Sequence, residues 1–483
     1  MYEKINPTQM FRERQLALLE EASNRRIARR LRAGRAPKAR RGMAAFLFAT
    51  LMVVGTMLVA LSSPAHSSTT FTVNSAADLA DVNGGDGICD ADAAVGNLCT
   101  LRAAINEANV TTDADTIDLN IPGTGVKTIS PNTVLPNIIH PVSIDGFTQP
   151  GAVPNTLSKG TNAKLMIELN GSGVTGTSER IGLRLAAPDS EVRGLVINRF
   201  TAGIAIFADG VRLSQNFIGT DPTGTQDLGN SSMGIFDQGF GSSIGTPRSD
   251  AGANLISGND GAGIAIRDLA SHTQVAHNLI GTDKSGTKKL GNSKEGVEIT
   301  NSSNNSLDSN TIAFNGGNGV KINDTSGSRT SSISSNSIFS NAIFSNAGLG
   351  IDLAGGEATP APGPIGIATT NDLQDVDSGP NGLQNFPVLS SAKTVSGKTT
   401  IKGKLNSSPN ESYTIQLFSN PSANEGKKLI GQKSVTTDVT GNRTFTFSTK
   451  KAVRVRQKIT ATATRESTLD TSEFSAARKV VSS

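Results

Sequence analysis

The chain has 483 residues, with no Trp, two Tyr and 4% aromatic residues overall, against 51 Gly. A core without large side chains must be filled by small β-branched and aliphatic ones, which suits stacked strands better than a helical bundle. Residues 1–42 carry 12 Lys/Arg and 4 Asp/Glu, residues 43–386 carry 17 and 31, and residues 387–483 carry 16 and 6. The acidic middle segment would repel phosphate, which argues against a nucleic-acid-binding protein.

The N-terminal region predicts export. Residues 1–42 form a basic segment expected in the cytoplasm, and residues 43–62 contain the uncharged apolar run Met43–Leu61. Nineteen apolar residues are about enough to cross a bilayer core of roughly 30 Å. The run is either a retained transmembrane helix or the hydrophobic part of a signal peptide, with small residues suited to cleavage near Ala65. We expect either a membrane-anchored protein with an extracytoplasmic body or a secreted one.

Residues 68–120 are predicted to form a capping segment. It contains the only two cysteines, Cys89 and Cys99, which in an exported chain predict a disulfide, with a two-sulfur metal site as the alternative. A short helix should follow with Thr100 as its N-cap, and it would cover the open end of a stack of strands. Its apolar stripe is formed by Leu101, Ala104, Ile105 and Ala108.

This segment also resembles a known family. The run Cys99–Asn109, preceded by Phe71–Asn74 and by Gly-Asp-Gly before Cys89, is similar to the CSLREA domain at the start of exported bacterial β-helix proteins. Thr100 replaces the Ser of that motif, and Ala103 replaces its Glu. The resemblance implies a fold and an exported location, and it implies no chemistry.

An acidic loop within the capping segment is a candidate calcium site, because clustered oxygen ligands suit a hard cation. Its spacing does not fit the twelve-residue EF-hand loop, and a solvated turn is the alternative, since Asp, Asn and Gly readily make turns. The candidate ligands are Asp81, Asn83, Asp86, Asp90 and Asp92.

Residues 121–386 contain two recurring phrases. The first is Asn-x-Ile, at Asn216, Asn254, Asn278, Asn310 and Asn336; the copies at 216 and 278 continue into Gly-Thr-Asp at an offset of 62 residues. The second phrase is close to Gly-Ile-x-Ile and begins at Gly203, Gly263, Gly296, Gly319 and Gly350. Short strands repeated at such spacing predict a parallel β-helix, in which each coil stacks on the next and the repeated Asn side chains bond to one another.

Two further stretches, Ile144–Gly151 and Gly379–Pro387, also resemble phrases of the same β-helix proteins, so the resemblance covers most of residues 70–390. The family resemblance implies a right-handed helix.

Asp221 and Asp283 are the candidate catalytic acids, because they occupy equivalent loops. If 62 residues make two coils, these residues lie about 9.6 Å apart, which barely suits the paired acids of an inverting glycosidase. A structural turn that the repeat itself requires is the favoured interpretation. His272 and His277 are five residues apart, which places them on opposite strand faces and favours surface turns over a shared ligand. The scarcity of Trp and Tyr also argues against deep sugar subsites.

Residues 387–483 alternate polar and apolar side chains over six or seven short segments, which predicts an immunoglobulin-like β-sandwich. A strand beginning near Val453 would carry a basic stripe on one face, either as a solvated outer face or as a docking surface for an anionic polymer or for the acidic helix. The predicted basic patch is Lys450, Lys451, Arg454, Arg456 and Lys458.

Taken together, these patterns predict an all-β exported protein: a transmembrane helix, a capping segment, a right-handed parallel β-helix and a β-sandwich. The favoured function is non-catalytic, a surface scaffold or adhesin-like protein that presents its helix to an anionic envelope polysaccharide or another surface protein. The alternative is a polysaccharide lyase or hydrolase on the same fold. No cofactor is predicted apart from the calcium candidate.

Overall fold

The computed structural model describes residues 68–482, apart from residues 93, 95, 177–178, 247–249, 269, 326–332, 355–367, 422–424 and 450. The predicted basic segment 1–42, the apolar run within 43–62, the cleavage point near Ala65 and the patch residue Lys450 lie outside the described residues. Within the described part, no helix is both long enough and apolar enough to cross a bilayer.

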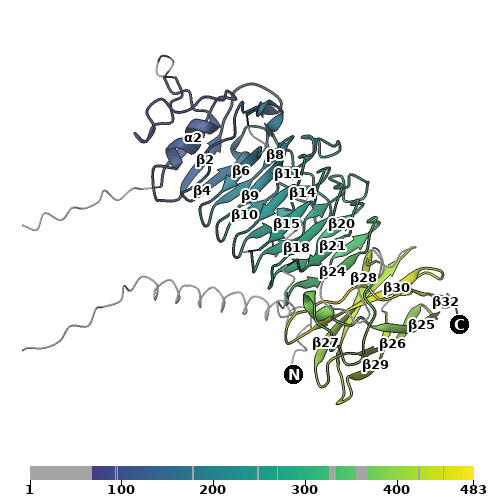
Figure 1. Cartoon of the computed structure of the whole chain (residues 1–483). Helices are drawn as coiled ribbons and strands as arrows, with labels where there is room; N and C mark the ends of the chain where they lie inside the picture. The colour runs from purple at the N-terminus through teal and green to yellow at the C-terminus, as the bar shows by residue number, and fades with distance from the viewer. Residues whose placement is uncertain are drawn as a thin grey trace, which may run out of the picture. The chain divides into compact units, whose positions relative to one another are not determined.

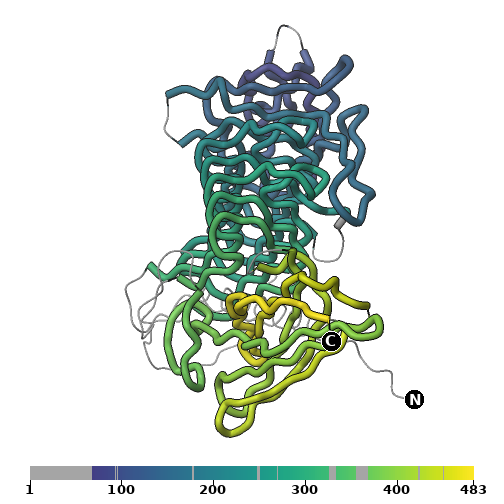
Figure 2. The backbone as a smooth tube through the Cα atoms, turned by 90° about the vertical axis from the view of Figure 1, so that its right-hand side faces the viewer, coloured from purple at the N-terminus to yellow at the C-terminus, as the bar shows by residue number. Residues whose placement is uncertain are grey.

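Three parallel sheets run through residues 70–354 (Figures 1 and 2), which confirms the predicted parallel β-helix. From β4 onward, successive strands along the chain enter the first, second and third sheets in turn, so that each coil adds one strand to each sheet. The first sheet contains β1 (Thr70–Val73), β2 (Asp115–Leu119), β4 (Val142–Asp145), β7 (Glu191–Arg193), β10 (Arg212–Ser214), β13 (Ser243–Gly245), β16 (Gln274–Ala276), β19 (Ser306–Asp308) and β22 (Ser337–Phe339). The second contains β3 (Lys127–Ile129), β5 (Ile167–Asn170), β8 (Leu195–Asn198), β11 (Phe217–Ile218), β14 (Leu255–Ile256), β17 (Leu279–Ile280), β20 (Thr311–Ala313) and β23 (Ala342–Phe344). The third contains β6 (Ile181–Leu185), β9 (Ala202–Ile206), β12 (Ile235–Asp237), β15 (Ile264–Arg267), β18 (Val297–Thr300), β21 (Val320–Asn323) and β24 (Ile351–Ala354).

The core consists of columns of aliphatic side chains, one from each coil. In the third sheet Ile204, Ile235 and Ile264 are paired in register and fully buried. The Gly before each such position is required by the next coil, since a Cβ at Gly263 would lie 2.7 Å from the carbonyl oxygen of Gly296. The Gly-Ile phrase therefore recurs because coils that stack about 4.8 Å apart leave no room for a side chain at the Gly position.

Buried Asn side chains form ladders at the corners between sheets, as predicted. In the first ladder each Asn donates from Nδ2 to Oδ1 of the Asn one coil later, over 2.9 to 3.2 Å. This ladder is Asn216, Asn254, Asn278, Asn310 and Asn341. A second ladder joins Asn230, Asn259, Asn292, Asn315 and Asn346, and a third joins Thr273, Asn305, Asn336 and Asn381.

The grouping of Asn336 with the first phrase is therefore wrong. Asn336 precedes β22 of the first sheet and belongs to the third ladder, whereas Asn341-Ala342-Ile343 supplies the missing copy before β23. Both corners need an Asn before an inward aliphatic residue, so the local sequence pattern cannot distinguish them.

The N-terminal end of the stack is covered by α2 (Leu101–Ala108), which packs against β1 and β2. Thr100 is its N-cap and accepts a hydrogen bond from the Ala103 N–H at 3.1 Å. The predicted apolar stripe is buried in the same core as the first coils. Short 3-10 turns occur elsewhere at Gly146–Thr148, Gly171–Gly173, Asp250–Gly252 and Pro380–Leu383.

The C-terminal domain is a sandwich of two four-stranded sheets. The fourth sheet has the order β29 (Asn442–Ser448), β26 (Lys398–Asn406), β25 (Val388–Val395) and β32 (Val481–Ser482). The fifth has the order β28 (Lys428–Thr436), β27 (Ser412–Asn420), β30 (Lys458–Arg465) and β31 (Arg478–Lys479).

The strand predicted from Val453 is present but begins later, because β30 runs only from Lys458. Arg454 and Arg456 lie in a turn closed by the Gln457 N–H on the Arg454 carbonyl at 3.2 Å. Val453 is buried and its N–H donates to the Thr399 hydroxyl at 2.8 Å, which diverts the chain away from a strand.

Candidate functional site

The two Gly-Thr-Asp loops follow β11 and β17, which are separated by β14 alone, so 62 residues do span two coils. The loops touch each other, since the Lys284 N–H donates to the Gly224 carbonyl at 2.9 Å. The intervening coil has no comparable insertion: residues 257–259 pass directly from β14 to the second ladder.

Asp221 and Asp283 each bind the backbone of their own loop. The Asp221 carboxylate accepts hydrogen bonds from the N–H groups of Thr225 and Gln226 at 3.0 and 2.9 Å and from the Thr223 hydroxyl at 2.6 Å. Asp283 repeats this arrangement with Ser285, Thr287 and Lys288. Burial raises the pKa of both carboxyls, but these hydrogen bonds outweigh it, and each pKa lies below its usual value. A general acid needs the opposite shift.

The carboxylate of Asp237 lies inside the helix and is fully buried. It accepts hydrogen bonds from the hydroxyls of Thr273 and Ser242 at 2.7 and 3.0 Å. Burial raises the pKa of Asp237 to about 6, although these hydrogen bonds act against the rise. A substrate cannot reach this group without opening the coil, so its role is to join the third sheet to the next corner.

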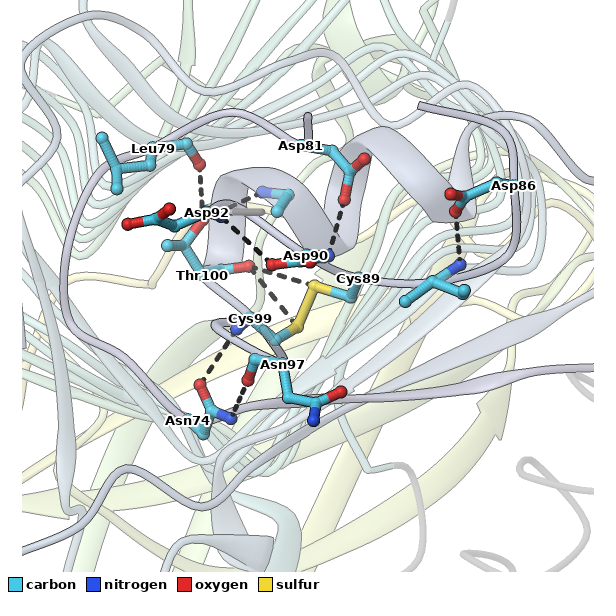
Figure 3. The surroundings of a disulfide bond; sticks show 12 residues. Asn74, Leu79, Asp81, Asp86, Cys89, Asp90, Asp92, Asn97, Cys99 and Thr100 are labelled. Carbon is cyan, nitrogen blue, oxygen red and sulfur yellow. Dashed lines mark hydrogen bonds between the residues drawn. A yellow bond between two sulfur atoms is a disulfide. The ribbon is translucent and has the colours of Figure 1, made fainter. Parts of the chain in front are cut away.

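The disulfide predicted between Cys89 and Cys99 is present (Figure 3), which confirms that part of the capping segment. Around it the carboxylates of the acidic loop hold turns: Asp81 Oδ2 accepts from the Asp90 N–H at 2.8 Å, and Asp86 Oδ1 accepts from the Ile88 N–H at 2.9 Å. Glu107 of α2 accepts from the N–H groups of two loop glycines, at 2.6 and 2.9 Å. The calcium prediction for this loop stays a prediction, and Asp81, Asn83, Asp86, Asp90 and Asp92 remain its candidate ligands.

A second acidic cluster, which the sequence reasoning missed, lies just before the sandwich. Within the described residues, Asp372, Asp375 and Asp377 are the three carboxylates that come within 4.8 Å of one another. Asp375 already pairs with Arg465 at 2.7 Å. Burial first, and then the charges of Asp372 and Asp375, raise the pKa of Asp377 to about 7. Asp375 therefore has a partner within the protein, whereas Asp377 Oδ1 is buried without a hydrogen-bond partner among the described residues.

The sandwich meets the last coil of the helix through acidic side chains, and not through the basic stripe, for which docking on the helix was one of the predicted alternatives. Glu425 accepts from the Ser345 N–H at 2.6 Å, and Glu473 accepts from the Leu353 N–H at 3.0 Å. The backbone of Gly426 also pairs with Ile343 in both directions, at 3.0 and 2.8 Å. Further acceptors are Asp470 for the Ser335 N–H, Thr471 for the Ile338 N–H and Gln416 for the Ser340 N–H.

Those carboxylates replace the coil that would come next. Glu425 Oε1 accepts from the Asn346 N–H at 3.1 Å, as the Asn Oδ1 atoms do along the second ladder. Burial raises the pKa of Glu425 and raises that of Glu473 to about 7, with the backbone hydrogen bonds acting against the rise. The sandwich thus covers the C-terminal end of the helix as a lid, and its carboxylates accept hydrogen bonds from the backbone N–H groups of the last coil.

The basic residues of the sandwich are left on its surface. Arg454, Arg456 and Lys451 of the predicted patch are exposed, and Lys458 is half-buried and pairs across the strands with Lys479. The fourth sheet adds lysines that the sequence reasoning did not single out, because their meeting depends on strand pairing. They are Lys393, Lys398, Lys402 and Lys404, all exposed.

No protein-family model matches the chain, and no curated protein matches it. Among solved structures, it is similar to the enzymatically active domain of tailspike protein 2 of bacteriophage CBA120, with 11% identity over 78% of this chain and 73% of that chain and a TM-score of 0.20. A likeness at this level carries no inference about chemistry.

Proposed function

We propose that the protein is a non-catalytic scaffold of the bacterial cell envelope, which displays a right-handed β-helix and binds an anionic envelope polysaccharide or another surface protein. In this proposal the CSLREA-like segment and the sandwich close the two ends of the helix. The N-terminal apolar run either holds the protein in the membrane or directs its secretion.

The observation that carries this proposal is that the candidate carboxylates are either hydrogen-bonded to backbone N–H groups or buried inside the helix. Asp221 and Asp283 are held by the N–H groups of their own loops and have lowered pKa values. Asp237 is enclosed within the coil, and Glu425 and Glu473 end the stack. A glycosidase needs one acid with a raised pKa facing a substrate together with a second carboxylate. These five residues do not supply that pair.

The test is a depolymerisation assay with the full-length protein purified in detergent. Polygalacturonate and other acidic polysaccharides are incubated with it, with calcium or with a chelator, and reducing ends and unsaturated products are measured. We expect binding without product. Product that accumulates in proportion to the protein would replace the scaffold with the enzyme alternative. Its loss in the double variant Asp221→Asn/Asp283→Asn would assign the chemistry to these two carboxylates.

A further inference from the structure

The fourth sheet carries an exposed face of lysines, formed by Lys393, Lys398, Lys402 and Lys404 and called here the lysine face. Lys398, Lys402 and Lys404 lie on β26, and Lys393 lies on the neighbouring β25, where it pairs with Thr400. In the described part of the chain, none of these four side chains makes an ion pair with a carboxylate. Their charges therefore face solvent without compensation.

The segments that build this face contain no acid. Residues 387–410, 443–465 and 474–483 carry 13 Lys/Arg and not one Asp or Glu. Strand pairing brings them together, because β25, β26, β29 and β32 of the fourth sheet all come from these segments. Arg454, Arg456, Arg478 and Lys479 are further exposed cations of the same domain.

Half of the acids of the domain are used elsewhere. The sandwich has six Asp/Glu, and Glu425, Asp470 and Glu473 are buried against the last coil of the helix. The other three, Glu411, Asp438 and Glu466, are too few to balance the 16 Lys/Arg of the domain. Charges gathered in this way steer and hold an anionic partner.

Hydroxyl groups lie beside the lysines on the neighbouring strand. On β29, Thr444 lies opposite Lys404 and Thr446 lies opposite Lys402, and both threonines are exposed. Along β26, Lys402 and Lys404 are about 7 Å apart and Lys398 to Lys404 spans about 20 Å, at about 3.4 Å per residue. A row of ammonium groups with hydroxyls alongside it matches an extended sugar chain that carries carboxylates. A bilayer surface would instead call for exposed apolar side chains that insert among the lipids.

We propose that the lysine face binds a linear polysaccharide bearing carboxylate groups, so that the sandwich, and not the β-helix, holds the polymer. This proposal rests on the proposed function and identifies the surface responsible. Each exposed lysine contributes weakly and is screened by salt. The affinity therefore comes from several contacts made at once and falls as ionic strength rises.

The test measures the affinity of the full-length protein in detergent for polygalacturonate by affinity electrophoresis and calorimetry, at about 50 and about 500 mM salt, a range over which the Debye length shortens severalfold. The lysine-face variant is Lys393→Gln/Lys402→Gln/Lys404→Gln. A control variant removes three exposed lysines from the β-helix and so changes net charge equally: Lys288→Gln/Lys289→Gln/Lys294→Gln. The single variant Lys402→Glu is a second probe, in case the triple variant folds poorly.

We expect binding by the lysine-face variant to weaken at least tenfold at low salt, and Lys402→Glu to weaken it in the same direction, whereas the control variant changes it less than about twofold. Absence of binding by the unmodified protein, or equal losses in both triple variants, would overturn the inference. Displacement of the polymer by soluble short-chain phosphatidylglycerol but not by galacturonate oligomers would also overturn it, in favour of lipid. Product release would instead refute the proposed function and leave the lysine dependence measurable.

Discussion

Removal of the Glu425 carboxylate should open the C-terminal end of the β-helix. In the native structure this group accepts from the N–H groups of Ser345 and Asn346 at 2.6 and 3.1 Å, and it is 5% exposed. Glu425→Ala leaves both part-buried N–H groups without this acceptor, at about 1–3 kcal/mol each. We therefore expect a loss of about 2–6 kcal/mol in the stability of this end of the molecule, with the exposed Ser345 favouring the lower part of that range.

The assay is hydrogen exchange on the full-length protein, because local opening near β23 and β24 need not unfold the remaining coils. Peptides covering Ser345 and Asn346 should exchange on the order of 30-fold faster or more, as each 1.4 kcal/mol corresponds to a factor of ten. Light scattering should also rise, since an uncovered strand edge invites pairing between chains. Glu411→Ala, in the same domain and away from the helix, is the matched control. Unchanged exchange in Glu425→Ala would refute the view of the sandwich as a lid.

Three further outcomes follow from the contacts described. The pKa of Glu473 is raised from 4.5 to about 7, so the folded protein takes up a proton at this carboxylate as the pH falls below about 7. We therefore expect the C-terminal lid to be about 2–3 kcal/mol more stable at pH 5 than at pH 8. Denaturant titrations at the two pH values measure this difference, and Glu473→Gln should reduce it. Asn278→Ala removes an amide that donates to Asn310 Oδ1 and to the Ile244 carbonyl and that accepts from Asn254. We expect the free energy of unfolding to fall by about 3–5 kcal/mol, measured as a lower denaturation midpoint, and an unchanged midpoint would contradict a stabilising role for the ladder. The double variant Cys89→Ser/Cys99→Ser should lose about 2–3 kcal/mol from the capping segment, seen as faster proteolysis of residues 76–110 while the later coils keep their protection.

The sequence predicted those parts of the fold that repeat from coil to coil. The Gly-Ile phrase and the Asn before an inward Ile recur because each coil must present the same groups to the next, and stacking makes that requirement visible along the chain. The disulfide needed only an even pair of cysteines in an exported protein. Asn336 was assigned to the wrong ladder, since the corners that precede the first and second sheets need the same residue type.

The surfaces depended on contacts between segments far apart along the chain. Three carboxylates of a domain with a net charge of +10 turn toward the helix, and no local pattern distinguishes them from the acids left outside. Arg454 and Arg456 alternate like residues of a strand, yet buried Val453 turns the chain before β30 begins. Side-chain alternation reports a strand only where tertiary packing allows one.

The amino-acid sequence by itself determined that this protein is a stack of parallel coils followed by a β-sandwich, because both architectures repeat short local patterns. Tertiary structure alone decided which carboxylates end the stack, and it decided that four lysines from two neighbouring strands share one face. Both arrangements arise from tertiary contacts between residues that no short-range rule connects, and they place three of the six acids of the sandwich against the helix while four lysines face solvent.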